Sequence, residues 1–410
     1  MGHSRAEAII TALANPPFPD DPYPLYHELR SLSPVYFSES GMCYVSSYEG
    51  CATVFRSAAF GQGEGARRVR LDPRFETSAT LQSLGRMLTF IDPPDHTRLR
   101  KLVSRAFTPM VIDRLRIYIR DLVDSLLDPL EETGTADLVS DFADHIPVTV
   151  ICELLGVPHE DHARCYEWSE AISLTVEYEV PDRALAAADR ATIAYEAYFR
   201  DLIAERRTAP GDDLLSGLIA AKDNTDRLSE DELVSMAVLL LGAGFETTRN
   251  LIGSGLLALL RHPGETAQLR DDPTVIRGAV EEFLRYESPV QTAVSRFALR
   301  DTDVDGVVVP EGTIVGAVIG AANRDPVRFS DPDRVDIDRP DNHPLTFAPG
   351  IHYCLGASVA RLEGEIAIDT AIRRFPGLSL TDDHPPMRNT CALGQNPRGP
   401  LRLPVSTGGR

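Results

Sequence analysis

The sequence has 410 residues, of which 43% are hydrophobic and 25% are charged, so its composition is that of a folded globular protein and not of a disordered, collagen-like or coiled-coil chain. Its 41 basic and 61 acidic residues give a formal net charge of −20 at pH 7. Because this charge is repelled by nucleic-acid phosphates and anionic lipids, we expect no nucleic-acid partner. The 6 cysteines form no CxxC pair, which argues against a disulfide framework or a structural zinc site and fits a reducing cytoplasm.

The start of the chain lacks the basic patch and apolar run of a signal peptide, and Pro16, Pro17 and Pro19 interrupt it early. The longest apolar stretch, residues 233–245, is too short and too interrupted to span a bilayer. We therefore expect a cytoplasmic protein without a membrane anchor, in which roughly the first 15 residues are flexible.

Short strands are predicted in two places, residues 35–45 and residues 296–318, where Gly306 and residues 310–312 mark turns. Between about residues 95 and 290, apolar residues recur at the three- and four-residue spacing of amphipathic helices. The chain contains no low-complexity linker and no internal repeat. We therefore predict one mainly α domain, residues 1–410, with a small β region.

One long helix is predicted from Ser229 to the residue before Pro263. Ser229 and Glu232 have the spacing of a capping box, and the absence of proline before Pro263 allows a length of about 50 Å. The middle of this helix, residues 242–248, reads Gly-Ala-Gly-Phe-Glu-Thr-Thr, and each glycine costs about 1 kcal/mol relative to alanine. A loss of this size in a helix centre indicates a packing or functional role.

Two interpretations of residues 242–248 are open. In the first, the glycines permit a close helix crossing, while Glu246 and the threonines are hydrogen-bonded in the core. In the second, Glu246 and Thr247 distort the helix around a water molecule and move protons into a buried site. The helix taken alone does not separate these interpretations.

Residues 347–356, Phe-Ala-Pro-Gly-Ile-His-Tyr-Cys-Leu-Gly, precede a helix predicted from about Gly356 to Arg374. Cys354 would lie at the N-terminus of this helix, where the macrodipole and free N–H groups favour a thiolate, and His352 adds a cationic partner. An isolated cysteine is more often a small buried hydrophobe. The full spacing Phe-x-x-Gly-x-His-x-Cys-x-Gly nevertheless favours a ligand.

This loop resembles the haem-binding signature of the cytochrome P450 monooxygenases, and residues 243–248 resemble the oxygen-activating helix segment of that family. Further matches follow in the family's order at residues 92–100, 282–285, 296 and 322–326. The similarity extends from about Asp20 to Val405 and is greatest to the soluble bacterial, actinomycete-type branch that tailors natural products. The resemblance implies the cytochrome P450 fold, with its long central helix over the haem.

The resemblance implies haem b as the cofactor, with Cys354 as the axial thiolate ligand of the iron. It implies that Glu246 and Thr247 are the acid–alcohol pair that supplies protons to iron-bound oxygen. The implied haem-binding positions are the propionate ligands His96, Arg100, Arg296 and His352 and the signature residues Phe347, Gly350 and Gly356. His343 fits a propionate ligand less well, because Pro344 shifts it by one place from the usual spacing.

Glu282 and Arg285 lie at i and i+3 on one helix face, a pairing common on helix surfaces. In this order along the chain, the pair resembles the family's buried Glu-Arg scaffold, whose role is folding and haem retention. The third partner is expected to be Arg334, with Arg339 as the alternative.

The sequence departs from the family at one position in the signature loop. The family usually has a glycine directly after the signature phenylalanine, whereas this chain has Ala348 followed by Pro349. Because both residues restrict the backbone, we expect an altered loop shape that shifts hydrogen bonding to the thiolate and the redox potential of the iron.

The implied activity is an O2-dependent monooxygenation that hydroxylates or epoxidises a hydrophobic small molecule, such as a polyketide or macrolide intermediate. The sequence contains no flavin, nicotinamide or iron–sulfur motif, so a separate ferredoxin and an NAD(P)H-dependent ferredoxin reductase are implied. The alternatives are a peroxide-driven peroxygenase, whose relatives carry Arg-Pro at the acid–alcohol position, and a non-catalytic recruitment module. A zinc site at His343, His352 and Cys354 would lack a fourth ligand. We expect a monomer.

The substrate pocket is expected to be apolar, although core packing explains each of its candidate positions equally well. The candidates are Leu88, Phe90, Ala243, Phe245, Val290, Val294 and Leu393. Arg67, Arg68 and Arg70 form a basic run that could meet an acidic substrate or a carrier protein, but a solvated run is the favoured interpretation.

A basic stripe is predicted at Arg98, Lys101 and Arg105, which recur at i, i+3 and i+7 on a different helix face from Arg100. Either an acidic ferredoxin docks there or these side chains are ordinary solvated helix charges.

Overall fold

The computed structural model describes residues 2–63, 72–107, 109–173, 175, 180–223, 226–382, 385–387, 392–393 and 397–408. The chain forms two compact units. Unit 1 comprises Met1–Phe60, Ile119–Ile146 and Glu246–Arg410, and unit 2 comprises Gly61–Tyr118 and Pro147–Phe245. Each unit combines segments that are far apart in the sequence, and the single domain expected from the sequence stays a prediction.

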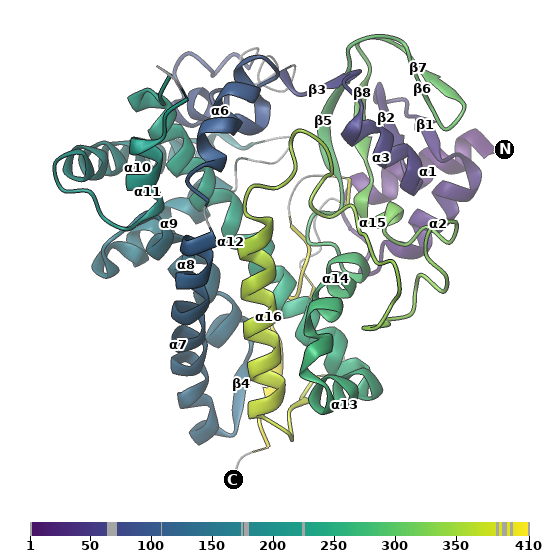
Figure 1. Cartoon of the computed structure of the whole chain (residues 1–410). Helices are drawn as coiled ribbons and strands as arrows, with labels where there is room; N and C mark the ends of the chain where they lie inside the picture. The colour runs from purple at the N-terminus through teal and green to yellow at the C-terminus, as the bar shows by residue number, and fades with distance from the viewer. Residues whose placement is uncertain are drawn as a thin grey trace. The chain divides into compact units, whose positions relative to one another are not determined.

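The chain is mainly helical with short strands, as the sequence predicts (Figure 1). The α-helices are α1 (Gly2–Ala14), α2 (Tyr23–Leu32), α3 (Tyr48–Arg56), α5 (Ala79–Leu84), α6 (Asp95–Ser104), α7 (Pro109–Thr133), α8 (His145–Leu155), α9 (His162–Ser173), α10 (Asp182–Thr208), α11 (Leu214–Ala220), α12 (Glu230–Arg261), α13 (Pro263–Asp271), α14 (Ile276–Tyr286), α15 (Ile319–Ala322) and α16 (Ala357–Arg374). Shorter helical segments are η1 (Leu88–Phe90), η2 (Val139–Ala143), η3 (His159–Asp161) and η4 (Pro273–Val275). No helix among the described residues is long and apolar enough to cross a membrane.

The two predicted strand regions join in one five-stranded sheet with the order β1-β2-β8-β5-β3. Its strands are β1 (Val35–Phe37), β2 (Met42–Val45), β3 (Phe60–Gly61), β5 (Ala293–Ala298) and β8 (Ile314–Ala317). Strands β2 and β8 pair in parallel with Met42 opposite Ile314, and β5 runs antiparallel to β8. Alternate residues such as Val45, Val315 and Ala317 are buried with α3 in one apolar cluster.

Two smaller sheets also lie among the described residues. The order β4-β10-β9 joins β4 (Thr135–Asp137), β9 (Ser379–Leu380) and β10 (Pro404–Ser406), and β6 (Thr302–Val304) pairs with β7 (Val307–Val309) as a hairpin. The hairpin turns at Asp305 and Gly306, which have φ of 53° and 78°. Gly306 therefore forms the predicted turn, because positive φ favours glycine.

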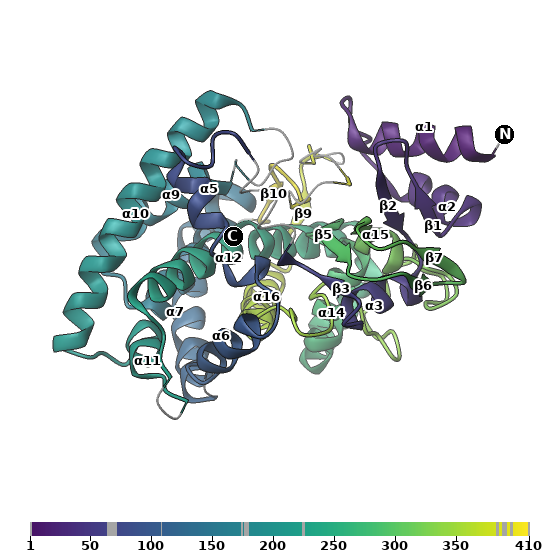
Figure 2. The same ribbon diagram turned by 90° about the horizontal axis from the view of Figure 1, so that it is seen from above.

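The first residues of the chain, expected from the sequence to be flexible, form helix α1. Ala6, Ile9, Ile10 and Leu13 are buried in an apolar cluster that also contains residues of α2 and β2. In Figure 2, α1 lies along α2 at one end of unit 1.

Unit 2 contains a helical layer in which α10 packs against α5, α9 and α11 (Figure 2). Trp168 of α9 contacts the ring of Tyr195 edge-on at 5.6 Å between centroids, and Tyr195 contacts Phe199 at 5.1 Å. Tyr195 and Phe199 are fully buried, so these aromatic side chains form the centre of the layer.

The long helix α12 begins as predicted. The Ser229 N–H donates to Glu232 Oε2 at 2.8 Å, and the Glu232 N–H donates to Ser229 Oγ at 3.2 Å, which is the expected capping box. The helix ends at Arg261, directly before His262 and Pro263. A Cβ atom at Gly255 would lie 2.7 Å from Ile368 of α16 and 2.9 Å from Phe283 of α14, so these three helices cross closely at Gly255.

The predicted Glu-Arg scaffold is a fully buried ion pair on α14. Arg285 Nε and Nη2 each donate to one oxygen of Glu282 at 2.7 Å, and both side chains are completely buried. A buried carboxylate is stable only when its oxygens are satisfied. The Asp336 N–H and the Asn342 amide also donate to Glu282, at 2.8 and 3.0 Å.

The third partner of the pair is Arg339, and the expectation of Arg334 was wrong. Arg339 Nε donates to the two Glu282 oxygens at 3.3 and 3.1 Å, whereas Arg334 is exposed and only its main-chain carbonyl accepts a hydrogen bond from Arg285. The chain turns at Asp331, whose φ is 44°, and Arg339 donates to the Asp331 carbonyl at 3.2 Å. The turn thus places the later arginine, not the earlier one, against the carboxylate.

We predict that Arg339→Ala lowers the free energy of unfolding by about 2 kcal/mol or more, because it removes charged donors from a buried carboxylate. Arg334→Ala is the matched control, and it should change stability by less than about 0.5 kcal/mol, since the carbonyl remains. Urea unfolding of both variants measures the difference. Equal destabilisation by the two substitutions would contradict this assignment.

A second buried carboxyl, Glu363, lies on α16. Its side chain is 4% exposed, Oε2 has no hydrogen-bonding partner among the described residues, and burial raises the pKa of the carboxyl to about 8. The folded protein therefore holds a proton on Glu363 at pH 7, which the unfolded chain has released.

The stability of the protein should consequently fall as pH rises from about 4.3, where the unfolded carboxyl titrates, towards 8, by up to about 1.4 kcal/mol per pH unit. The penalty is absent below this window and complete above it. We predict that Glu363→Gln removes this slope, whereas the exposed Glu76→Gln keeps it. Unfolding free energies at pH 5 and pH 7 test the prediction, and a slope unchanged in Glu363→Gln would contradict it.

Candidate active site

The signature loop folds back on itself before α16 begins. The Cys354 N–H donates to the Phe347 carbonyl at 3.0 Å, and the Tyr353 N–H donates to the Gly350 carbonyl at 3.1 Å. Gly356 is the N-cap of α16, and the predicted helix to Arg374 is confirmed. The backbone thus holds Cys354 just ahead of the first turn of the helix.

Two residues of the loop adopt positive φ. Gly350 has φ of 119°, and a Cβ atom there would collide with the Phe55 carbonyl oxygen, so only glycine fits. Ala348 has φ of 50°, which costs a residue with a Cβ atom about 1 kcal/mol. A glycine at position 348, which the family usually has, would adopt this φ without strain.

The loop is anchored by Asn323, which the sequence motif contained but to which we assigned no role. Asn323 is fully buried; its Oδ1 accepts from the Leu345 N–H at 2.7 Å, and its Nδ2 donates to Thr346 Oγ1 at 2.9 Å. Thr346 Oγ1 donates in turn to the Leu284 carbonyl on α14 at 2.7 Å. The segment leading into the loop is thereby fixed to the helix that carries the Glu282–Arg285 pair.

Arg361 is a further residue missed by sequence reasoning. It comes from α16, places its guanidinium 4.4 Å from the centre of the Phe347 ring, and donates to Tyr353 Oη at 2.9 Å. Arg361 also pairs with Glu281 of α14. The signature phenylalanine is thus held between the loop and α16 by a cation–π contact.

Cys354 differs from the other cysteines that the structure describes. Cys43, Cys51, Cys152 and Cys165 are buried, and burial raises the pKa of the Cys43 thiol to about 12, whereas Cys354 is exposed. The N-terminus of α16 favours negative charge at this place. A Cβ atom added at Gly356, two residues further on, would meet nothing within 4 Å. An exposed thiol at the N-terminus of a helix fits a haem-thiolate ligand.

The middle of α12 also faces open space, although the residues around it are buried. Gly242 and Ala243 are exposed, and a Cβ atom at Gly242 or Gly244 would meet nothing within 4 Å. The close helix crossing therefore lies at Gly255 and not at these two glycines, which removes the first part of the packing interpretation. Glu246 and Thr247 are half-buried on the next turn.

The predicted propionate ligands are distributed over both units. In unit 1, Arg296 of β5 is 4% exposed, with its guanidinium 5.5 Å from the centre of the Phe55 ring, and His352 is half-buried. In unit 2, His96 and Arg100 share one face of α6 at i and i+4; His96 is buried and Arg100 half-buried. Buried or half-buried guanidinium and imidazole groups of this kind can donate hydrogen bonds to carboxylate partners.

The candidate substrate-pocket residues have different environments. In unit 2, Leu88 is buried, Phe90 is half-buried, Ala243 is exposed, and the buried Phe245 packs edge-on against Tyr166 at 5.0 Å. In unit 1, Val290 is half-buried beside the sheet cluster, and Leu393 is buried with residues of α1 and α2. Val294 lies in β5, and its side chain is outside the described set, as are Arg67, Arg68 and Arg70.

His343 is directed away from any buried site, since its side chain is 76% exposed and pairs with Asp341 at 3.2 Å. This exposure agrees with its weaker match to the propionate position. Within the described residues, no group of three or more His, Cys, Asp or Glu side chains could hold a metal ion.

The basic stripe is neutralised by acidic partners inside unit 2. Lys101 and Arg105 pair with Asp223 at 2.6 and 2.9 Å. Arg98 pairs with Glu232 and, at 3.4 Å, with Asp226. Three basic groups therefore meet three acidic ones, which favours ordinary helix charges over a docking surface for an acidic partner.

The comparisons with known proteins agree over most of the chain. A family model described as Cytochrome P450 matches residues 32–401. The chain is 39% identical to the biotin biosynthesis cytochrome P450 of Bacillus subtilis (strain 168), over 91% of this chain and 94% of that protein. It is 40% identical to the mycinamicin IV hydroxylase/epoxidase of Micromonospora griseorubida, over 93% and 94% of the two chains. A crystal structure of P450BioI with hexadec-9Z-enoic acid ligated acyl carrier protein matches with a TM-score of 0.85 and 36% identity, over 94% of this chain and 98% of that chain.

We predict that Ala348→Gly raises the free energy of unfolding by about 1 kcal/mol, because glycine adopts positive φ without a steric penalty. Gly350→Ala is the opposite control in the same loop, and it should be destabilising by more than about 2 kcal/mol, given the collision with the Phe55 carbonyl. Chemical unfolding measures both changes. A loss of stability in Ala348→Gly would show that the positive φ is not a strain on this loop.

Proposed function

We propose that this chain, which belongs to the cytochrome P450 family and is a monooxygenase of it, uses O2 and two externally supplied electrons to hydroxylate or epoxidise a hydrophobic small molecule. The observation that carries the proposal is the exposed thiol of Cys354, held by the signature loop at the N-terminus of α16. Haem b bound at this thiolate would supply the oxygen-activating chemistry of the family. The other steps depend on side chains of this chain.

Cys354 would hold the haem iron through its thiolate, and the surrounding loop would keep the charge of the thiolate in place. The helix dipole of α16 stabilises the thiolate, and the Cys354 N–H is already used by the Phe347 carbonyl. Arg361 holds the Phe347 ring by a cation–π contact. Ligand orientation would therefore be set before the cofactor binds, which lowers the cost of binding.

Glu246 and Thr247 would hold and move protons. They lie on α12 between the exposed stretch in the middle of the helix and its buried residues further on, and both are half-buried. A carboxyl and a hydroxyl are therefore placed at the boundary between exposed and buried parts of the helix. Glu246 would accept a proton from the solvent side, and Thr247 would orient it towards the reacting oxygen. An Arg-Pro pair would be expected here in a peroxide-driven relative, so Glu246 and Thr247 disfavour that alternative.

The imidazole and guanidinium groups of His96, Arg100, Arg296 and His352 would bind the two propionates. The residues that match the family's haem-binding positions are distributed over both units, and we propose that residues 1–410 act as one catalytic domain. A recruitment module would not need the thiol or the acid–alcohol pair, both of which this chain retains.

The substrate is proposed to be a natural-product intermediate. One relative acts on mycinamicin IV, as the name mycinamicin IV hydroxylase/epoxidase states, and P450BioI is seen in complex with an acyl carrier protein that carries hexadec-9Z-enoic acid. Electrons would come from a ferredoxin and its reductase, at a surface other than the neutralised stripe of α6.

We predict that the haem-loaded protein, reduced and exposed to carbon monoxide, shows the red-shifted Soret band of a thiolate ligand. Cys354→Ser should lose this band, because a hydroxyl does not donate charge to iron as a thiolate does. Cys165→Ser is the matched control at a buried thiol and should keep it. A thiolate-type band retained in Cys354→Ser would overturn the ligand assignment.

We predict that Thr247→Ala keeps haem and substrate binding but lowers the yield of product per electron by about tenfold or more, with the lost electrons appearing as peroxide. Thr248→Ala is the neighbouring control; Thr248 is buried and assigned no proton role. The consumption of the electron donor, the formation of peroxide and the formation of product are measured in the same reaction. Equal coupling in the two variants would contradict the role of Thr247.

A further inference from the structure

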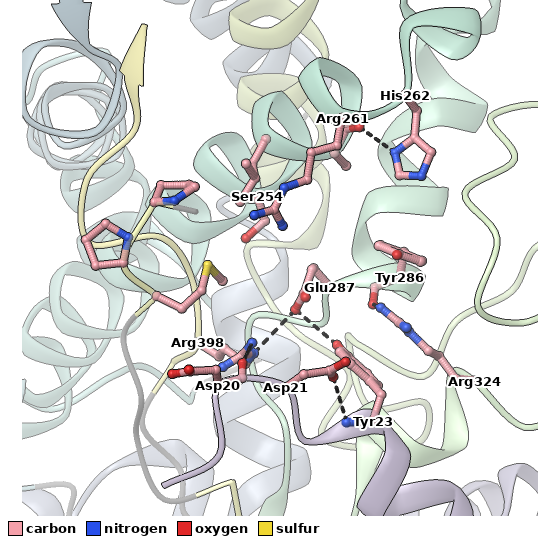
Figure 3. Close-up of a pocket in the computed structure, with 15 residues that line it drawn as sticks. Asp20, Asp21, Tyr23, Ser254, Arg261, His262, Tyr286, Glu287, Arg324 and Arg398 are labelled. Atoms are coloured by element: carbon pink, nitrogen blue, oxygen red, sulfur yellow. Dashed lines mark hydrogen bonds and ion pairs between the residues drawn. The ribbon is translucent and has the colours of Figure 1, made fainter. Parts of the chain in front are cut away.

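A polar cavity of about 450 Å³ lies within unit 1, against the C-terminal half of α12. Figure 3 shows Ser254 and Arg261 on one side, both from α12, with Glu287, Arg398, Asp20 and Asp21 facing them. At about 30 Å³ per molecule, the cavity has room for on the order of ten waters. It is lined by none of the residues predicted to contact haem or substrate.

Two polar side chains of α12 are buried at or near this cavity: Ser254 lines it, and Asn250 lies one helical turn before Ser254. Asn250 is 1% exposed and Ser254 is 2% exposed. Neither the amide of Asn250 nor the hydroxyl of Ser254 has a hydrogen-bonding partner in the described part of the chain. Leaving such groups unsatisfied costs about 1–3 kcal/mol each, so ordered water is the expected partner.

These side chains continue the row of polar groups that begins at the proposed proton carrier. Glu246, Asn250 and Ser254 lie at i, i+4 and i+8 on α12, which is one helix face. Successive members are about 6 Å apart along the axis, a gap that one water molecule bridges. Asn250 also packs against Gly399, the neighbour of the cavity residue Arg398.

The side chains near the cavity become less exposed from its mouth, at Asp20 and Asp21, towards α12. Asp20 and Asp21 are exposed, Glu287 is half-buried, and Ser254 and Asn250 are buried. Glu287 accepts from Tyr23 Oη at 3.1 Å and lies 3.5 Å from Arg398 Nε. Titratable groups at the mouth can exchange protons with bulk water, while the inner polar groups can only relay them.

We propose that the cavity, Ser254 and Asn250 form a water-filled path that carries protons from solvent to Glu246. The inference rests on the proposed proton role of Glu246. Each proton that leaves the Glu246 carboxyl is replaced by one from bulk water, so the residues of the path are unchanged after a cycle. Ser254 and Asn250 are positioning residues that order the water; they do not touch the substrate.

The first test compares Ser254→Val with Ser254→Thr, which have nearly the same shape but differ in the hydroxyl. We expect Ser254→Val to lower the rate of product formation by about tenfold and to raise its solvent hydrogen-isotope effect, because the path is interrupted. Ser254→Thr should stay within about twofold of the wild type. Haem content and the substrate-induced spectral shift should be equal in both, which excludes a folding defect.

The second test detects water at Ser254 without turnover. In the haem-loaded protein, the Ser254→Cys thiol should react with methyl methanethiosulfonate about tenfold faster or more than the thiol of Leu256→Cys, measured by mass spectrometry. Leu256 is fully buried on the same helix and is the dry control. Equal, slow labelling would show that no water reaches Ser254.

The two proposals can fail separately. If the wild type gives no thiolate spectrum and no product, the proposed function is wrong, and the labelling rates still report whether the path is hydrated. If the wild type is active and Ser254→Val matches Ser254→Thr in rate and isotope effect, the cavity does not supply the protons, whatever the labelling shows.

Discussion

The fully buried carboxylate of Glu282 is the constraint on which the placement of the candidate site depends. A charge with no access to water is tolerated only if every lone pair is used, and here Arg285, Arg339, Asn342 and the Asp336 N–H all donate to it. These donors come from α14 and from the irregular segment after residue 330. Satisfying one carboxylate therefore fixes a long stretch of chain that has no regular hydrogen bonding of its own.

The same network reaches the signature loop through Asn323. Arg285 donates to the Asn323 carbonyl at 3.0 Å, while the Asn323 side chain binds Leu345 and Thr346 just before Phe347. An irregular loop with two positive-φ residues has little intrinsic preference for one shape. The position of the Cys354 thiol is thus determined by buried polar contacts some distance away, and the local strain at Ala348 is held by them.

The sequence was sufficient to predict features that depend only on residues close together in the chain. The capping box at Ser229 and Glu232, the hairpin turn at Gly306 and the i, i+3 pair of Glu282 and Arg285 follow from backbone spacing alone. The sequence was not sufficient where tertiary contacts decide which side chain takes a given role. The choice of Arg339 over Arg334 depends on the turn at Asp331, and the anchoring role of Asn323 depends on a loop 22 residues away in the sequence. The acidic partners of the α6 stripe were missed for the same reason.

The middle and the C-terminal part of α12 serve two different physical purposes. At Gly255, the absence of a side chain lets α14 and α16 approach closely, and this close packing makes the position of the helix rigid. At Gly242 and Gly244, the absence of a side chain leaves space that no described atom fills. Between them, Asn250 and Ser254 introduce polar groups that packing alone would disfavour. A helix that is closely packed in one part and open in another can hold a carboxyl at a fixed place while leaving room for water beside it, and proton transfer requires both conditions.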